Sequence, residues 1–352
     1  MKTKTKNQIE LLNKAYKGTQ LKGLPARPME LSKGQARFSD LDNEIILYLD
    51  YQGQNSLVNI PANKCKDGDI VNDNDNIFIE SGNSKIPLQK SSQELPLREF
   101  LNCLHQTKCK ASDLLQAINF VLPAVSKYDY NNILGSIHFD TDIVATDGNR
   151  LHIAPNPFDL GKFSFDLPAT KSHLLTKFLI PFLKASNDDV TISIFKENVE
   201  FSSDLGSVSL RKSSGTYPNY KFLIPTKYKH ELYVNPVNMI NGINSVKHTA
   251  NEITNLLKIH ASDFKSLELS TSAVDLGQSS ATVASDIVTF DDIYFNYHYL
   301  LDAFNVFKSL KYDHLKWVNN GHLTPNVISS NDNDFMILVM PIKHEALSPA
   351  AK

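Results

Sequence analysis

The chain has 352 residues, more than one ordinary core organises, so we expect two or three domains. Hydrophobic residues make up 41% of the sequence, which is enough to bury such cores. A formal net charge of −2 argues against a protein coated with nucleic acid over its whole surface, although it allows a local basic lining. No window reaches the ~18 uncharged apolar residues of a membrane span, and residues 1–8 lack the apolar core of a secretory signal. These features predict a cytoplasmic protein without membrane contact.

Motifs for metals and nucleotides are missing from the sequence. The three cysteines form no Cys-x-x-Cys pair, and the 11 histidines form no His-x-x-x-His pair. Neither glycine pattern that binds phosphates, Gly-x-x-x-x-Gly-Lys or Gly-x-Gly-x-x-Gly, occurs. We therefore expect no metal site and no cofactor.

The N-terminal part of the chain alternates short strand patterns with polar loops. Its one helical pattern places Leu11, Leu12 and Tyr16 on a common face. After residues 60–64 the chain runs directly into an Asp/Gly-rich loop, so no second helix is expected there. The expected elements are a helix over residues 7–17, a strand over 44–51, and a hairpin of 77–79 with 84–88.

Two stretches that lie 122 positions apart align without a gap. Residues 76–101 read NIFIESGNSKIPLQKSSQELPLREFL, and residues 198–223 read NVEFSSDLGSVSLRKSSGTYPNYKFL. A match of this length indicates that a unit of roughly 110–120 residues is used at least twice. Each unit would end in a hairpin followed by a crossing segment that contains proline. Strand patterns at residues 326–329 and 335–340 predict a third copy.

The second and third copies share an order of elements. In the second we expect helices over residues 111–125 and 170–184, with strands over 133–139, 143–144, 190–194, 199–201 and 207–210. In the third we expect helices over 236–246 and 297–310, with strands over 256–260, 266–269 and 287–290.

This order predicts an α+β protein of three repeated units, each with two helices packed on antiparallel sheets. The first unit is abbreviated, because it lacks an apparent second helix. Lysines lie on the helix sides away from the expected sheets, a pattern shared by solvated faces and nucleic-acid contacts, so both interpretations stay open. The expected domains are residues 1–106, 107–228 and 229–343, followed by a tail at 344–352.

The middle copy contains a strand, a tight turn and a strand at residues 144–151. Asp147-Gly148 is a strong turn signal, because glycine accepts the positive φ that such turns require. Arg150 and His152 share a strand face, so a surface His–Arg pair beside Asp147 is available to a catalytic site. No nucleophile or metal shell accompanies it, and we expect that the protein is not an enzyme.

Four motifs follow one another at spacings that match the repeat: ATDGNRL at 145–151, YPNYKFLIP at 217–225, FNYHYLLDAF at 295–304 and MILVMPIK at 336–343. Together they resemble the β subunit of bacterial DNA polymerase III, the sliding clamp. The resemblance covers residues 107–343 well and 1–106 weakly. It implies the three-domain DNA-clamp fold and a non-catalytic processivity factor.

The resemblance implies a head-to-tail homodimer, a ring whose helices line a hole around duplex DNA. Lysines would contact phosphates without reading bases, which permits sliding. The candidate DNA contacts are Lys14, Lys17, Lys127, Lys171, Lys177, Lys247, Lys308 and Lys311.

The family also has a peptide groove between its second and third domains, which takes short hydrophobic motifs of polymerases and clamp-loader subunits. Such grooves need apolar walls and few polar groups. Carried over by position, the groove residues are Ile133, Thr146, Gly148, Asn149, Arg150, Leu151, Pro218, Phe222, Leu223, Leu338 and Met340.

This sequence departs from the family pattern at several positions. Asn149 replaces the usual histidine, Tyr130 stands where some members have arginine, and Asn131 and Asn132 replace two aromatic residues of a DNA-contacting loop. The chain continues past the family's usual end, and we hypothesise that the tail at 344–352 covers the groove and competes with partner peptides. Because the first unit is abbreviated, the alternative is a clamp-like module that binds clamp partners without closing a ring on DNA.

Overall fold

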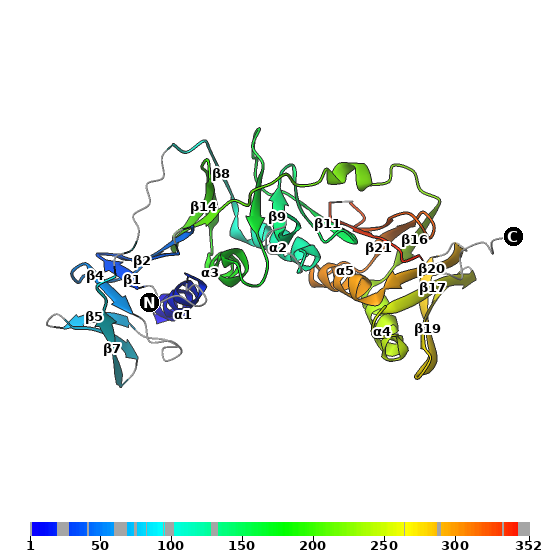
Figure 1. Ribbon diagram of the computed structural model, residues 1–352, viewed down its shortest axis with the longest axis horizontal. Helices are drawn as coiled ribbons and strands as arrows, with labels where there is room; N and C mark the ends of the chain where they lie inside the picture. The colour runs from blue at the N-terminus through cyan, green and yellow to red at the C-terminus, as the bar shows by residue number, and fades with distance from the viewer. Residues whose placement is uncertain are drawn as a thin grey trace. The chain divides into compact units, whose positions relative to one another are not determined.

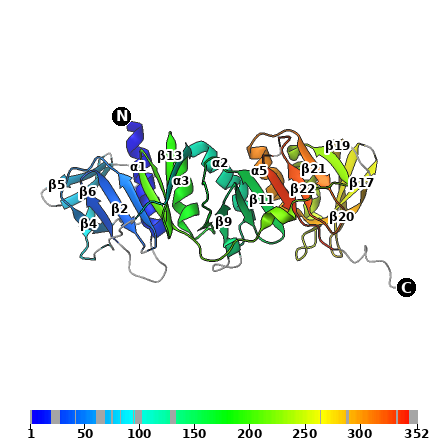
Figure 2. The same ribbon diagram turned by 90° about the horizontal axis from the view of Figure 1, so that it is seen from above.

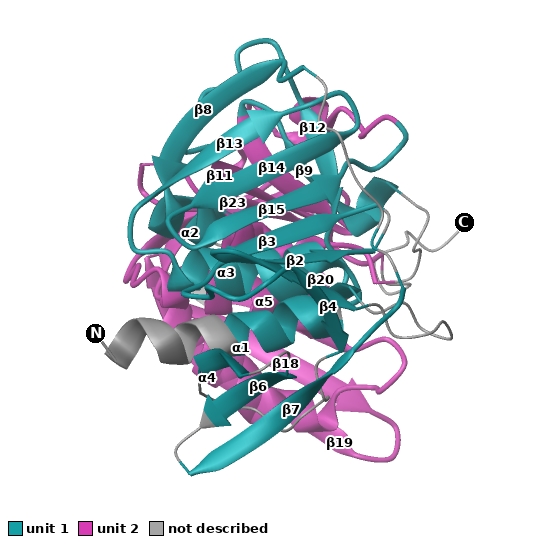
Figure 3. Ribbon diagram, turned by 90° about the vertical axis from the view of Figure 1, so that its left-hand side faces the viewer, with its two compact units in different colours: residues 1–117, 128–141, 156–215 teal, residues 118–127, 142–155, 216–352 magenta. Residues whose placement is uncertain are grey.

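A computed structural model describes residues 2–19, 28–40, 42–59, 69–73, 76–81, 83–93, 95, 102–127, 133–263, 265–286, 290–332 and 334–343. Helices α1 to α5 and strands β1 to β23 are labelled in Figure 1. The chain forms two compact units (Figure 3). Unit 1 contains residues 1–117, 128–141 and 156–215, and unit 2 contains 118–127, 142–155 and 216–352. The three-domain division expected from the repeat stays a prediction.

Unit 1 is built on an 11-stranded antiparallel sheet, in the order β5-β6-β7-β4-β1-β2-β3-β15-β14-β13-β8. The strands β9 and β12 pair with each other in the same unit. The bounds are β1 Met29–Ser32, β2 Gln35–Ser39, β3 Glu44–Tyr48, β4 Ser56–Asn59, β5 Asp69–Asp73, β6 Asn76–Ser81, β7 Ser84–Lys90, β8 His105–Lys110, β9 Ser136–Phe139, β12 Phe165–Pro168, β13 Asp189–Ile194, β14 Asn198–Ser203 and β15 Gly206–Arg211.

The sheet of unit 2 runs in the order β10-β11-β23-β22-β21-β16-β19-β18-β17-β20. Its neighbouring strands are antiparallel, and buried aliphatic and aromatic residues fill the space between this sheet and the helices. The bounds are β10 Asp142–Thr146, β11 Arg150–Pro155, β16 His230–Val234, β17 Leu256–Asp263, β18 Ser266–Ala273, β19 Gly277–Asp286, β20 Phe290–Asn296, β21 Leu315–Asn319, β22 Asn326–Ser329 and β23 Met336–Val339.

The helices pack against these sheets. In unit 1, α1 contacts α3 and the strands β2 and β3, and Figure 2 shows the two helices side by side. In unit 2, α4 and α5 pack together and against β18, β19 and β20. No helix of the described residues is long and apolar enough to cross a membrane. The bounds are α1 Lys2–Thr19, α2 Ala111–Val121, α3 Ile180–Ala185, α4 Pro236–Val246 and α5 Tyr297–Ser309, with short helical turns η1 Leu122–Ala124, η2 Ile133–Gly135, η3 Leu175–Leu179, η4 Tyr220–Leu223 and η5 Lys247–Thr249.

The predicted repeat is confirmed in the paired hairpins. In β6–β7, Ile77 faces Leu88, and in β14–β15, Val199 faces Leu210, so the two registers differ by the same 122 positions as the sequences. The strands β22 and β23 also form the predicted pair, with Ile328 facing Ile337. The crossing segment at 96–101 lies outside the described residues.

Two predicted helices have the expected ends. The side chain of Asn235 accepts hydrogen bonds from the backbone of Val237 and Asn238, which caps α4, and Pro236 occupies its first turn. Asn296 caps α5 in the same way, by accepting from His298. These caps explain why the periodic patterns begin where they do.

The helix predicted over residues 170–184 is wrong in its first part. The segment begins with turns, continues as the wide π-type turn η3, and becomes α-helical only at Ile180. Pro181 lacks a backbone N–H and its ring crowds the carbonyl four residues earlier, so a regular helix cannot run through it. The strand predicted over 133–139 is also shorter, since residues 133–135 form η2. The region of the missing second helix, 60–68, the segment 128–132 and the tail 344–352 lie outside the described residues.

In unit 1, a glycine allows β15 to approach β3 closely. Gly206 begins β15 with a φ of +139°, and a Cβ there would lie 2.0 Å from the carbonyl oxygen of Ile46. Only glycine therefore lets β15 pair with β3 at this point. The same junction is held by the backbone N–H of Tyr48, which donates to Leu205 at 2.9 Å.

Candidate functional site

The turn between β10 and β11 is fixed by its own side chains. Gly148 has the expected positive φ, +88°. The carboxylate of Asp147 accepts from the backbone N–H groups of Asn149 and Arg150, at 3.0 and 3.2 Å. The hydroxyl of Thr146 donates to the carbonyl of Arg150 at 2.6 Å and accepts from Gly148. The predicted turn is confirmed, and it is rigid because short polar side chains satisfy its backbone.

Arg150 connects this turn to two other segments of unit 2. Its guanidinium donates to Asp147 at 3.1 Å, to Asp302 of α5 at 2.6 Å, and to the carbonyl of Pro123 in η1. It also lies 4.6 Å from the centre of the Tyr299 ring. A planar guanidinium matches several acceptors at once, so this buried residue acts as a cross-link within unit 2.

The strand β23 lies directly beside this turn. Leu151 faces Leu338 in the β11–β23 ladder, and the N–H of Met340 donates to the carbonyl of Asn149 at 2.9 Å. The structure therefore brings together predicted groove residues that are about 190 positions apart in the chain.

The predicted groove residues divide into a buried support and an exposed surface. Thr146, Arg150, Leu151 and Leu338 are buried in unit 2. Ile133 lies half-buried in unit 1. The exposed members in unit 2 are Gly148, Asn149, Pro218, Phe222, Leu223 and Met340.

Three of the exposed members carry large apolar side chains. Phe222 is 87% exposed, Leu223 51% and Met340 37%. The first two belong to η4, where Tyr220 is buried and its hydroxyl donates to Asp142 at 3.0 Å. This bond ties η4 to the start of β10, so its apolar side chains are displayed from a supported turn.

The predicted DNA-contacting lysines mostly lie at the surface. Lys14 is paired with Glu10 of the same helix at 2.6 Å. Lys247 is half-buried and donates to Asn244 at 2.8 Å, while Lys127 and Lys308 are exposed. In unit 1, Lys17, Lys171 and Lys177 are also exposed, and in unit 2 so is Lys311.

Two histidines, His298 and His173, lie within electrostatic range of some of these lysines. Burial lowers the pKa of His298, Asp302 raises it, and the positive charges of Lys127 and Lys247 lower it further. In unit 1, burial and the nearby Lys177 lower the pKa of His173. Lys127 and Lys247 therefore each lie within electrostatic range of His298, which is in the first turn of α5.

The His–Arg pair expected on the surface is buried, which corrects that expectation. His152 has no exposed surface, and its Nδ1 donates to the carbonyl of Phe120 at 2.8 Å. Its Nε2 therefore carries no proton, and it has no hydrogen-bond partner among the described residues. Burial, opposed by that hydrogen bond and aided by Arg150, lowers the pKa of His152 to about 3. A substrate has no access to this group.

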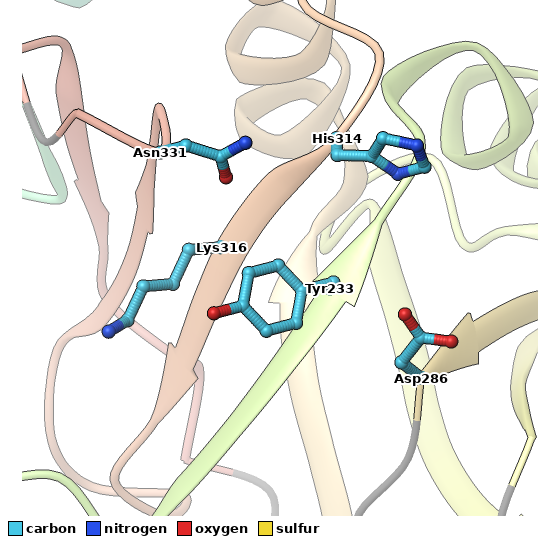
Figure 4. Close-up of a pocket in the computed structure, with 5 residues that line it drawn as sticks. All are labelled: Tyr233, Asp286, His314, Lys316 and Asn331. Atoms are coloured by element: carbon cyan, nitrogen blue, oxygen red, sulfur yellow. The ribbon is translucent and has the colours of Figure 1, made fainter.

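A polar cavity of about 500 Å³ lies elsewhere in unit 2 (Figure 4). Tyr233 and Lys316 enter it from β16 and β21, and both contact Glu231. Such walls lack the apolar anchors of a peptide groove. No cluster of three metal-binding side chains is found in the described parts of the chain. The lining residues are Tyr233, Asp286, His314, Lys316 and Asn331.

Known proteins resemble this sequence. No family model matches it. The chain is 26% identical to the β sliding clamp of Streptococcus pneumoniae over 279 residues, which cover 76% of this chain and 72% of that protein. It is 25% identical to the β sliding clamp of Bacillus subtilis over 282 residues, with the same coverage.

Solved structures extend the similarity over nearly the whole chain. The DNA polymerase III β subunit of Thermotoga maritima matches with a TM-score of 0.82 at 18% identity and covers 97% of each chain. The chain has the sliding-clamp fold. A sliding clamp of Bartonella birtlesii with bound griselimycin also gives a TM-score of 0.82, at 20% identity, over 96% of this chain and 98% of that one. The resemblance to sliding clamps is thus confirmed in sequence and in fold, and it agrees with a non-catalytic protein.

Replacing Arg150 tests its role in the clamp-fold turn. Arg150→Lys keeps the positive charge but loses the planar fork, so we expect the free energy of unfolding to fall by about 2–3 kcal/mol. The midpoint of urea unfolding measures this change. Asp302→Asn is the matched control; its side chain is 41% exposed, so its loss should cost about 1 kcal/mol or less. Equal losses in the two variants would contradict the proposed cross-link.

His152 predicts a loss of stability in mild acid. Its pKa is lower in the folded than in the unfolded state, so the unfolded chain binds the extra proton as pH falls below ~6.5. This single group should cost about 2 kcal/mol between pH 7 and pH 5, and the loss should continue until pH approaches 3. Urea titrations of wild type and His152→Gln across this range measure the difference in slope. Parallel pH profiles would exclude a buried neutral histidine.

Proposed function

We propose that this chain is a DNA sliding clamp that encircles duplex DNA and tethers its partner proteins through a peptide groove. The observation that carries this proposal is the clamp fold over 97% of the chain, together with sequence similarity to two β sliding clamps. It also accounts for a modest net charge, because strong positive charge is needed only where DNA passes.

Exposed lysines on the helical segments support contact with phosphates. In unit 1, Lys177 lies in η3 and Lys171 lies in the turns just before it, and in unit 2 Lys308 lies in the last turn of α5. Flexible ammonium groups bind phosphate without base specificity, which suits a protein that slides.

Open sheet edges in each unit support a head-to-tail homodimer. In β19, Gly277 to Ala284 pair with β18 on one side, and the described residues place no strand on the other side of this segment. In unit 1, among the described residues, which exclude 60–68, Ser84 to Leu88 of β7 pair with β6 only. A strand edge with unpaired backbone groups is a template for pairing with a second chain. We propose that β7 of one protomer and β19 of its partner form the ring contact.

Partner binding is the second part of the proposal. The exposed Phe222, Leu223 and Met340 offer anchors for a short hydrophobic peptide, and the rigid turn at Asp147 supports Asn149 and Arg150 beside them. Polymerase and clamp-loader subunits are the expected partners. The alternative is a module that binds such peptides without closing on DNA. The next experiment distinguishes this alternative from a closed ring.

A closed ring should be retained on circular DNA. We expect a native mass of two chains by light scattering, and retention on nicked circular DNA that is lost when the circle is linearised. Lys171→Gln with Lys308→Gln should lower the slope of log affinity against log salt by up to ~2, because each lost phosphate contact contributes ~0.9. Lys162→Gln, an exposed lysine outside the helical segments, is the control. A monomer that is never retained on circles would favour the alternative module.

We propose that griselimycin occupies the groove, and the compound is a suitable probe because a sliding clamp of Bartonella birtlesii has been solved with it bound. We expect it to bind this chain, and Met340→Glu or Phe222→Ser to raise its Kd by about tenfold or more, because each removes an apolar contact. Isothermal titration calorimetry measures the Kd. Val237→Ser, an exposed apolar residue on α4, should leave it unchanged. Equal binding by all variants would place the compound elsewhere.

A further inference from the structure

The two units share one arrangement, in which a hairpin pairs with a later strand. The predicted groove uses only the arrangement in unit 2. In unit 2, the β10–β11 hairpin pairs through β11 with β23. In unit 1, the β2–β3 hairpin pairs through β3 with β15. In both units a four-residue turn leads into a strand. The other edge of that strand pairs with the last strand of the next copy of the repeat.

The turns correspond residue by residue. The carboxylate of Asp40 accepts hydrogen bonds from the N–H groups of Asp42 and Asn43. In the same way, Asp147 accepts from the N–H groups of the residues at the second and third positions after it. Asn43 therefore stands where Arg150 stands in unit 2. Each closing strand donates a hydrogen bond to its turn. The N–H of Arg211 donates to the side-chain oxygen of Asn43 at 2.9 Å, and the N–H of Met340 donates to the backbone carbonyl of Asn149.

The side chains at these matching positions differ in length. Arg150 reaches across to η1 and α5. The short amide of Asn43 instead bonds to Asp40, at 3.1 Å to each carboxylate oxygen. A cavity of about 190 Å³ is found beside Asn43. It is lined by Asp42, Asn43, Pro168, His173, Leu174, Leu175, Leu210, Arg211 and Lys212.

The floor of this cavity is apolar. Leu174, Leu175 and Leu210 line it and are themselves at most 5% exposed. Its volume is below the ~300–1,000 Å³ of sites for drug-sized molecules. The cavity therefore suits one aliphatic side chain of a longer ligand.

The rim carries two basic side chains, Arg211 and Lys212, and one acidic side chain, Asp42, and Glu197 lies within electrostatic range of both basic groups. Arg211 pairs with Asp42, and its other N–H groups reach solvent, since the side chain is 56% exposed. Lys212 donates to the carbonyls of Phe195 and Lys196, at 2.6 and 3.2 Å. An ammonium group has three N–H bonds, so one is left for a ligand. A carboxylate is the natural complement to this rim.

We propose that this cavity is a second peptide-binding site in unit 1, which takes a short acidic peptide. An aliphatic side chain enters over Leu174, Leu175 and Leu210, and an adjacent carboxylate accepts from Arg211 and Lys212. The site rests on the cavity itself, so it stands whether or not the groove of unit 2 binds partners.

The test uses methyl resonances of the full chain. The probe is the peptide acetyl-Gly-Gly-Leu-Asp-Gly-Gly-amide, added to protein with labelled leucine methyl groups. We expect shifts at Leu174, Leu175 and Leu210 at concentrations that leave Leu151 and Leu338 of unit 2 unchanged. Peptides with Asn for Asp, or Ala for Leu, should bind about tenfold more weakly, as should the variant Arg211→Gln. Lys162→Gln is the matched control and should not alter binding.

Three results would overturn the proposal. They are no shift at the three leucines, equal binding by the acidic and amide peptides, or shifts at these leucines with a DNA duplex but not with the peptide. The last would assign the rim, with its neighbours Lys171 and Lys177, to phosphate contact. Loss of griselimycin binding or of retention on circular DNA would leave these leucine shifts unaffected.

Discussion

The structure depends on one pairing, in which the closing strand of one repeat adds to the hairpin of the preceding repeat. In unit 2, β23 pairs with β11, and in unit 1, β15 pairs with β3. Each pairing continues a sheet, so it sets where the neighbouring helices pack. The turn before each strand is held by an aspartate that satisfies two backbone N–H groups, so the edge offered to the closing strand has a fixed register. At Gly206 the space between β15 and β3 is so small that a single Cβ would collide with the opposite backbone.

The two pairings then diverge through one side chain. Arg150 places a buried cation among two carboxylates, a carbonyl and an aromatic ring, and so joins β11 to α5 and η1. Such a cation is tolerated only because each of its edges finds an acceptor. At the corresponding place Asn43 satisfies its amide within its own turn and leaves a cavity. A long cross-link in one unit and an open site in the other therefore follow from the same backbone.

Features set by nearby residues could be predicted from the sequence. The turn at Asp147-Gly148, the caps of α4 and α5 and the register of the repeated hairpins all depend on bonds between residues close in the chain. Family motifs supplied the rest of the architecture, because the repeat alone does not say how units join. The pairing of Arg150 with Asp302 could not be predicted this way, although Asp302 lies inside a recognised motif. These two residues are 152 positions apart and meet only once the third copy packs on the second. The burial of His152 could not be predicted for the same reason. A strand pattern assigns residues to one face of a sheet, but it does not say which other segments cover that face.

Exposed apolar side chains cost solubility, so their position in unit 2 is informative. Phe222 and Leu223 are displayed on a turn whose Tyr220 is buried and bonded to Asp142, and Met340 follows a strand held against Asn149. If these residues were merely poorly packed, nothing would require a buried support beneath them. A surface that binds extended peptides does require one, because side chains already held in place lose less conformational entropy on binding. The buried members of the predicted groove, Thr146, Arg150, Leu151 and Leu338, supply that support, and in the proposed function contact with a partner falls to the exposed members.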